Sequence, residues 1–142
     1  MTDEIILEDG RVWSAASWAV DRVLQEIAKD LSESGGDPVF CGWLRDKSGH
    51  CNGLVGFDVR GLTDRHRTEF YEGVRRAVDR LKAEGPTGWR EPSAFDNFIK
   101  HFSQLLVMKE HIDRGEPPES LNDFQKAIEF DGQILDLAER WD

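Results

Sequence analysis

The sequence predicts an α+β fold, with a small antiparallel sheet centred on a hairpin over residues 38–60 and about four helices packed against it. Apolar residues recur with a period of two between residues 38 and 62, as in half-buried strands. Through most of the remaining chain they recur at spacings of three and four, as on one face of a helix. At 142 residues the chain is long enough for one domain with a hydrophobic core and too short for two of ordinary size. We therefore expect a single domain over residues 1–142.

The predicted hairpin joins two strands through a short loop. Small and apolar residues share one face of both strands: Val39, Cys41 and Trp43 in the first, and Cys51, Gly53, Val55, Phe57 and Val59 in the second. Between them, Asp46–His50 fits a three-residue loop in which Gly49 takes the left-handed conformation that glycine adopts at low cost. In this register the two cysteines lie about 13 Å apart along the strands, too far for a disulfide or a shared zinc ion.

A shorter apolar run lies near the N-terminus. Glu4–Glu8 is followed by Asp9 and Gly10, a pair typical of two-residue turns, and then by Val12 and Trp13. This pattern predicts an edge strand or a small hairpin.

Four helices are predicted from apolar residues at helical spacing, and the first three end at stretches with glycine or proline. They cover residues 15–32, 63–84, 93–114 and 120–141, with a break near Gly132 in the last. Ser14, Thr63 and Ser93 stand at the starts of the first three, where a hydroxyl group is suited to N-capping. Trp18 is expected on the buried stripe of the first helix.

The formal net charge is −10, and the negative charge is concentrated at the two ends of the chain. Residues 1–37 hold nine acids and three bases, residues 38–109 nine acids and twelve bases, and residues 110–142 ten acids and three bases. Because phosphate groups are bound by clustered Lys and Arg, this layout argues against nucleic acid or an anionic membrane as the main partner. It permits a basic protein partner, although acidic helices also serve simply to keep a protein in solution.

The short motifs that mark common enzyme classes do not occur in the sequence. There is no GxGxxG, Walker A loop, HExxH, CxxC pair or GxSxG. His101 and His111 lie roughly 80° apart around the third predicted helix, which disfavours a shared metal ion. We therefore expect no catalytic set, no metal site and no cofactor. No apolar run approaches the roughly 18 residues of a membrane span, and the N-terminus lacks the basic start of a signal peptide, so we expect a soluble cytoplasmic protein.

These observations favour a non-enzymatic, acidic domain that binds a basic protein partner. Immunity proteins and antitoxins, which occlude a toxin, are of this general physical type, and their association with the toxin is accelerated by opposite charge. The expected contact residues are the acids of the C-terminal segment together with a loop tryptophan: Glu116, Glu119, Asp123, Glu129, Asp136, Glu139 and Trp89. Trp89 either packs back onto the domain or stands out beside Arg90 as an interface anchor.

Two alternatives stay open at this point. A small enzyme or ligand-binding module would have its site beside the hairpin, around His50, Arg60 and His66. The stretch of residues 60–82 is the most basic in the chain, and a phosphate or carboxylate ligand could use some of its arginines. A homo-oligomeric structural subunit would use Trp89 or Trp141 as a contact.

Overall fold

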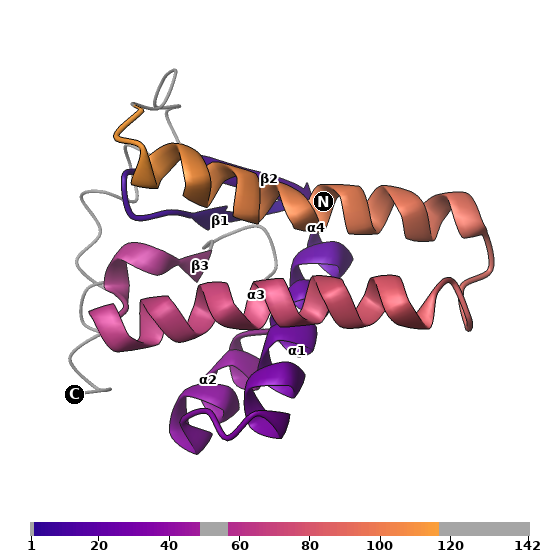
Figure 1. Ribbon diagram of the computed structural model, residues 1–142, viewed down its shortest axis with the longest axis horizontal. Coiled ribbons are helices and arrows are strands. Elements are labelled where there is room, and N and C mark those ends of the chain that lie inside the picture. Colours follow the sequence, from indigo (N-terminus) through magenta and orange to yellow (C-terminus); the bar gives the residue numbers. More distant parts are fainter. Residues whose placement is uncertain (1, 49–56, 117–142) are drawn as a thin grey trace.

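The computed structural model describes residues 2–48 and 57–116, and over these residues the chain has the α+β fold that the sequence predicts (Figure 1). A mixed sheet of three strands is combined with four α-helices in this part of the chain. The strands are β1 (Thr2–Ile6), β2 (Val12–Ala16) and β3 (Phe57–Asp58). The helices are α1 (Ser17–Glu33), α2 (Pro38–Ser48), α3 (Asp64–Glu84) and α4 (Pro92–Asp113), and a single 3₁₀ turn, η1 (Val59–Gly61), follows β3.

Strand β1 lies in the centre of the sheet, in the order β2-β1-β3. It pairs antiparallel with β2, where Ile5 lies opposite Trp13, and parallel with β3, where Ile5 lies opposite Phe57. The predicted antiparallel sheet is therefore wrong for one of its two ladders. Because α1 and α2 intervene between β2 and β3, the chain has room to cross over and run parallel to β1.

The β1–β2 hairpin is closed by the three-residue loop Glu8–Gly10. The Leu7 N–H donates to the Arg11 carbonyl, and the Gly10 N–H donates to the Leu7 carbonyl, both at 2.9 Å. Gly10 has a φ of +93°, the left-handed conformation that such a loop requires at its last position. The hairpin expected from Asp9 and Gly10 is thus confirmed, with β1 at the centre of the sheet instead of its edge.

The predicted hairpin over residues 38–60 is wrong in its first strand, because Pro38–Ser48 form helix α2. The Asp37 carboxylate accepts a hydrogen bond from the Val39 N–H at 3.0 Å, as an N-cap residue does. Phe40, Cys41 and Leu44 are buried at helical spacing, whereas Val39 is 62% exposed. Of the predicted second strand, Phe57–Asp58 forms β3 and residues 49–56 lie outside the described part of the chain.

Three of the predicted helices are confirmed, with ends within two residues of the expected ones: α1, α3 and α4. The Thr63 hydroxyl accepts from the His66 N–H at 3.1 Å and caps α3 as predicted. Ser14 and Ser93 are not caps, because α1 follows Ala16 and α4 follows Glu91, neither with a side-chain capping bond. The expected helix over 120–141 lies outside the described residues.

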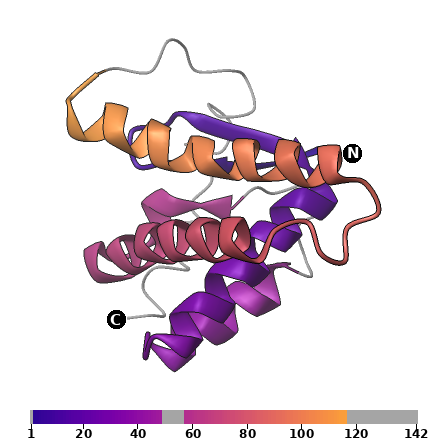
Figure 2. The same cartoon turned by 45° about the vertical axis from the view of Figure 1, so that its right-hand side comes forward.

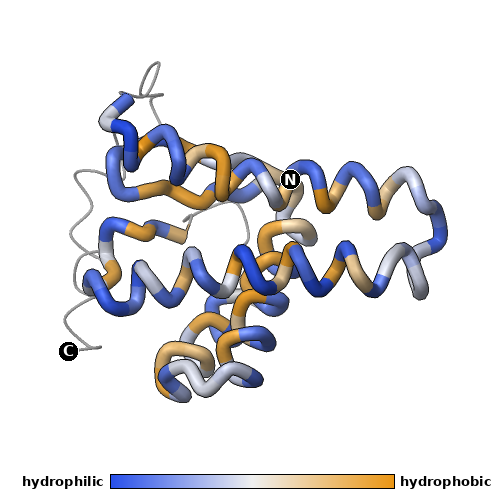
Figure 3. The backbone as a smooth tube through the Cα atoms, in the orientation of Figure 1, coloured by the Kyte–Doolittle hydropathy of each residue, from blue (hydrophilic) through white to orange (hydrophobic). Residues whose placement is uncertain are grey.

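Helix α1 is the hub of the packing. It contacts α2, α3 and both strands of the hairpin, and it crosses α3 steeply while α3 and α4 run alongside each other (Figures 1 and 2). The end of β1 and much of α1 are hydrophobic, whereas α3 alternates between hydrophobic and hydrophilic residues along its length (Figure 3). The core thus lies between the sheet, α1 and the inner faces of α3 and α4.

An ion cluster fixes the crossing of α1 and α3. Arg80 of α3 donates to both Asp30 oxygens, the closer at 2.6 Å, and to Glu26. The Asp30 hydrogen bond and the Glu26 charge raise the pKa of Arg80. Burial raises the pKa of Glu26, but the bonds from Arg80 outweigh it and leave this pKa below its usual value. The cluster is partly buried, so removing one partner costs more than breaking an exposed ion pair, and it fixes which faces of the helices meet.

Gly73 allows the two helices to approach closely at the same crossing, and replacing it tests this contact. A Cβ atom at position 73 would lie 2.7 Å from Ile27 Cγ2 and 3.1 Å from Leu31 Cγ. We expect Gly73→Ala to lower the free energy of unfolding by about 1–3 kcal/mol, as overpacking does. Gly42→Ala is the matched control, since a Cβ at that position of α2 meets no atom within 4 Å and alanine is favoured in helices by about 1 kcal/mol. Urea denaturation measures both, and equal effects at the two positions would contradict the close approach.

Candidate functional site

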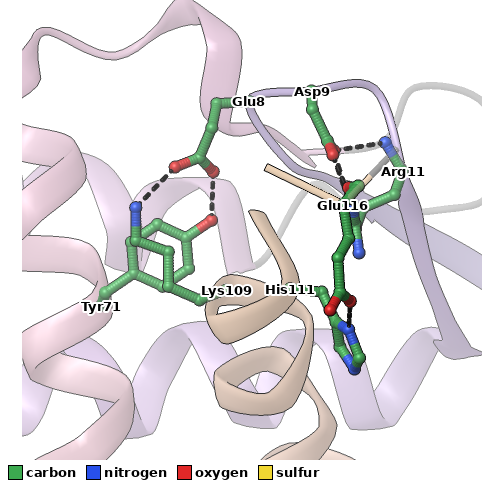
Figure 4. Close-up of polar contacts among 7 residues, drawn as sticks. All are labelled: Glu8, Asp9, Arg11, Tyr71, Lys109, His111 and Glu116. Carbon is green, nitrogen blue, oxygen red and sulfur yellow. Dashed lines mark hydrogen bonds and ion pairs between the residues drawn. The ribbon is translucent and has the colours of Figure 1, made fainter. Parts of the chain in front are cut away.

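A polar cavity of about 530 Å³ lies between α3, α4 and the β1–β2 loop. Glu8 reaches it from the loop, Arg67, Tyr71 and Arg75 from α3, and Lys109 from α4. These side chains converge because the loop lies against the α3–α4 pair, so that Tyr71 and Lys109 both face the Glu8 carboxylate from the same side (Figure 4). The elements that build the core therefore also assemble the cavity.

Glu8 is the centre of the polar contacts in this cavity. One carboxylate oxygen accepts a hydrogen bond from the Tyr71 hydroxyl, and the other lies 3.0 Å from Lys109 Nζ. Lys109 also contacts Asp113 at 3.0 Å, and its ammonium group lies 4.8 Å from the centre of the Tyr71 ring. Each charged group at this point is thus held by a neighbour of opposite charge or by an aromatic face.

The same contacts set the protonation of Tyr71 and Lys109. Burial raises the pKa of Tyr71, and its hydrogen bond to the Glu8 carboxylate raises it further. Burial lowers the pKa of Lys109, but the Glu8 and Asp113 carboxylates outweigh this effect and raise it overall. At neutral pH the phenol is therefore un-ionised and the amine is charged, so neither is prepared to act as a base or a nucleophile.

A second polar chain lies beside this cavity and contains Glu116. Arg11 binds the Asp9 carboxylate at 2.6 Å and donates to the Glu116 carbonyl at 2.6 Å. The Glu116 carboxylate pairs with His111, which holds the pKa of Glu116 below its usual value (Figure 4). Glu116, the last residue of this described stretch, therefore lies beside the β1–β2 loop.

A less polar surface, which we call the aromatic trough, runs between β2, the start of α1 and α4. Two cavities of about 570 and 340 Å³ adjoin there, because both are lined by Asn97 and His101. The residues that define the trough are Trp13, Ala15, Trp18, Asn97, Phe98 and His101. Trp18 is 58% exposed and stacks against Phe98, with ring centres 6.0 Å apart. The trough thus presents a large aromatic side chain to solvent.

One side of the trough is the outer edge of β2. Leu7 and Arg11 form a hydrogen-bonded pair, and such pairs alternate along an antiparallel ladder, so the backbone of Ser14 points away from β1. His101 Nε2 donates to the Ser14 carbonyl at 2.6 Å, and the Trp13 indole N–H donates to the His101 carbonyl at 2.8 Å. The His101 side chain of α4 therefore covers the outer edge of β2 at Ser14, the middle residue of that strand.

The structure describes two of the seven predicted partner-binding residues, Trp89 and Glu116. Trp89 is partly buried and packs on Phe95 and Phe98, with ring centres 5.5 and 5.4 Å away, and the Arg22 guanidinium lies over its ring at 5.3 Å. Trp89 also contacts Trp18 edge-on at 6.4 Å. The other predicted acids lie outside the described residues: Glu119, Asp123, Glu129, Asp136 and Glu139.

The residues of the alternative site are engaged separately within the fold. Arg60 binds Asp58 through its side chain at 2.7–3.1 Å. His66 is only 2% exposed, lies 3.1 Å from the Asp37 carboxylate and stacks on Phe40 at 4.6 Å. The three cavities described above are lined by other residues, and His50 lies outside the described part of the chain.

Trp18 was not identified from the sequence as a surface residue, although a signal was present. The prediction put it on the buried stripe of α1. The residues that form that stripe are Ala19, Val20, Val23, Leu24, Ile27, Ala28 and Leu31. They are consistent with helical spacing without residue 18, which leaves the indole at the margin of the apolar face.

No protein-family model, curated protein or solved structure matches this chain. Within residues 2–48 and 57–116, no group of three or more His, Cys, Asp or Glu side chains is arranged to hold a metal ion. In the same ranges, every helix is too short or too polar to cross a membrane. The function of this chain must therefore be inferred from its own geometry.

Tyr71 is the single tyrosine of the chain, so its ionisation can be followed by absorbance without interference. Because its pKa is raised in the folded protein, its contribution to stability is complete below pH ~10, the value for an unfolded chain, and is lost as the pH rises further. We expect the tyrosinate signal to appear only well above pH ~10 in the native protein and near pH ~10 in concentrated urea. A native titration near that of the urea sample, with the fold intact by circular dichroism, would contradict the buried contact with Glu8.

Proposed function

We propose that this chain is a non-enzymatic, acidic protein-binding domain whose partner is a basic protein, acting in the bacterial cytoplasm. In the most specific form of the proposal it is an immunity protein or antitoxin that occludes a toxin. Three observations support it: the exposure of Trp18, the negative charge of the chain, and the raised pKa values of Cys41 and Tyr71.

The observation that carries the proposal is the exposure of Trp18 in the aromatic trough. Tryptophan is enriched among the few residues that supply most of the binding free energy at interfaces. Here Trp18 is 58% exposed, and its indole stacks on Phe98 and contacts Trp89 edge-on. Glu91 and Asp96 are exposed at the start of α4, a few residues from Phe98 in the sequence, and would supply part of the polar rim that surrounds an interface core.

The charge of the chain supports a basic partner. The net charge is −10, and residues 110–142 alone contain ten acids and three bases. Within this segment, Glu116 lies beside the β1–β2 loop, where Arg11 donates to its carbonyl. A field of one sign accelerates encounter with a partner of the opposite sign and disfavours partners of like sign.

The reactive side chains described above support binding over catalysis. Burial raises the pKa of the Cys41 thiol, which is 1% exposed, and inert thiols have this environment. Tyr71 is un-ionised at neutral pH because of burial and its bond to Glu8. A lowered pKa is one of the ways in which enzymes activate a nucleophile, and the pKa values of Cys41 and Tyr71 are both raised.

A ligand-binding module remains the second candidate, and a specific observation favours the polar cavity over the site first expected around His50, Arg60 and His66. Arg75 lines this cavity and is exposed. Arg67 donates to Asp64 and to the Leu62 carbonyl, but its Nε is buried without a hydrogen-bond partner among the described residues. Two guanidinium groups beside a charged amine could bind a phosphate or carboxylate. The homo-oligomer alternative would use the aromatic trough against a second copy of the chain.

The variant Trp18→Ala tests whether the exposed Trp18 contributes to partner binding. We expect it to weaken partner binding by about tenfold or more, as loss of an interface hot spot does, with little change in the unfolding midpoint. Val39→Ala is the matched control, because Val39 is 62% exposed and lies on α2, away from the trough. Tagged proteins would be used to capture partners at low salt from the native cell, and binding of the basic protein identified by mass spectrometry would then be measured in purified form.

Two outcomes of this experiment, and one outcome of gel filtration on the same proteins, would overturn the proposal. Equal capture by wild type and Trp18→Ala would remove the aromatic trough from the interface. A retained partner that is neutral or acidic would remove the electrostatic argument. A dimer in gel filtration that is lost in Trp18→Ala would assign the trough to self-association.

Charge reversal tests the acidic segment separately. We expect Glu119→Lys, Asp123→Lys and Glu129→Lys together to slow association on the order of tenfold and to flatten its salt dependence, because long-range attraction acts mainly on the association rate. The matched control changes the net charge equally at exposed acids of α1 and α3, in the variant Glu33→Lys, Asp79→Lys and Glu84→Lys. Stopped-flow association over a salt series measures both, and equal slowing in the two variants would contradict a role for this segment.

A further inference from the structure

The outer edge of β2 presents backbone groups that have no partner among the described residues. The pair formed by Leu7 and Arg11 at the hairpin loop is hydrogen-bonded. Because hydrogen-bonded pairs alternate along an antiparallel ladder, the N–H groups of Val12, Ser14 and Ala16 point away from β1. Within residues 2–48 and 57–116, none of these three N–H groups donates a hydrogen bond. A row of unpaired backbone groups is a template for another strand.

The aromatic trough follows this edge along its whole length, with α4 as its opposite wall. Helix α4 runs alongside β2 (Figures 1 and 2). Val12 and Met108 line one of the two cavities, and Ala16 and Ala94 line the other. Residues 94–108 of α4 span about 21 Å, and the five residues of β2 span about 17 Å. The trough is therefore long enough for an extended segment that pairs with the whole of β2.

His101 separates the two cavities at the middle of the trough. It lines both cavities, and its Nε2 donates to the Ser14 carbonyl at 2.6 Å. The His101 side chain is exposed, and an exposed hydrogen bond contributes little net free energy because water replaces each partner when it breaks. The Ser14 carbonyl is also the group that would accept from the N–H of an incoming strand. The His101 bond therefore occupies a place that an added strand would take.

The chemistry of the trough differs from the acidic character of the chain. The sequence contains 28 Asp and Glu residues, yet none of them is among the described residues that line the two cavities. Lys100 and His101 are the basic residues there, while Trp18 and Phe98 form an aromatic wall at one end and Met108 lies at the other. Such walls favour a segment with apolar side chains and without an excess of positive charge.

We propose that the aromatic trough binds an extended, largely apolar segment of the partner protein, which adds to the sheet as a strand beside β2. The segment accepts hydrogen bonds from the N–H groups of Val12 and Ser14 and replaces His101 on the Ser14 carbonyl. In this mode of recognition the main-chain bonds supply affinity, and cavities for alternate side chains supply selectivity. The inference rests on the proposed function for the existence of a protein partner, and it adds the way in which the trough is occupied.

A library of random peptides displayed on phage tests the site with the full chain. Peptides of about nine residues exceed the roughly five that would pair with β2. We expect selection to enrich peptides with apolar residues at alternate positions. We expect an enriched peptide, made synthetically, to slow amide hydrogen exchange at Val12 and Ser14 by about tenfold or more, as measured by NMR, because new hydrogen bonds protect these amides. Absence of enriched peptides, or a bound peptide that leaves this exchange unchanged, would overturn the proposal.

Proline variants test the backbone contact directly. Val12→Pro removes the outward N–H and leaves the bonds of the β1–β2 ladder in place, as proline on an edge strand does. We expect it to weaken peptide binding by about tenfold or more, whereas Val12→Ala keeps the N–H and is expected to change the affinity by about twofold at most. Ser14→Pro, with Ser14→Ala as its control, provides a second pair should circular dichroism show that Val12→Pro is unfolded. Equal affinities of the proline and alanine variants would contradict strand addition.

His101→Ala tests the replacement of the histidine bond. We expect this variant to bind the peptide about threefold or more tightly, because the Ser14 carbonyl is then open to the peptide N–H. An affinity equal to or below that of the wild type would contradict the replacement. The result is separable from the proposed function: a chain that captures a basic protein but binds no peptide overturns this inference alone. A chain that binds the peptide but captures no basic protein overturns the proposed function alone.

Discussion

The close packing of α1 against α3 at Gly73 is the constraint on which the rest of the structure depends. A side chain at this position would collide with Ile27 and Leu31, so the absence of one allows the helices to meet and lets Arg80 reach Asp30 and Glu26. From this crossing α1 extends in two directions, back to the hairpin through its first turn and on to α2 beyond its last. Both the aromatic trough and the polar cavity take their shape from elements that α1 or α3 holds in place.

Much of the helical part of the fold could be predicted from the sequence, because each of those elements contains its own boundary signals. Helix α3 has an N-cap at Thr63, an apolar face that includes Phe70 and Val74, and a terminating Gly85 with a φ of +74°. Local signals of this kind act within a few residues and need no knowledge of the tertiary structure. They account for the agreement at α1, α3 and α4.

The sheet and the candidate sites could be predicted less well, because they depend on which distant segments meet. In Pro38–Ser48 the apolar residues are dense enough to fit both a period of two and a helical period, and the helix signals of Asp37 and Pro38 decide between them. Asp3 shares its strand face with buried Ile5, so its burial follows from the pairing of β1 and cannot be predicted from the polar residue itself. Trp18 likewise becomes an exposed anchor only where α4 meets the edge of β2.

The bond from His101 to the Ser14 carbonyl has a consequence for folding. An open strand edge pairs readily with other chains, and folded proteins protect such edges with side chains or neighbouring elements. Here the protecting group is His101 of α4, which lies 87 residues after Ser14 in the chain. During synthesis and folding the hairpin would therefore exist before its cover does, and any partly folded chain without a docked α4 would be prone to self-association through β2.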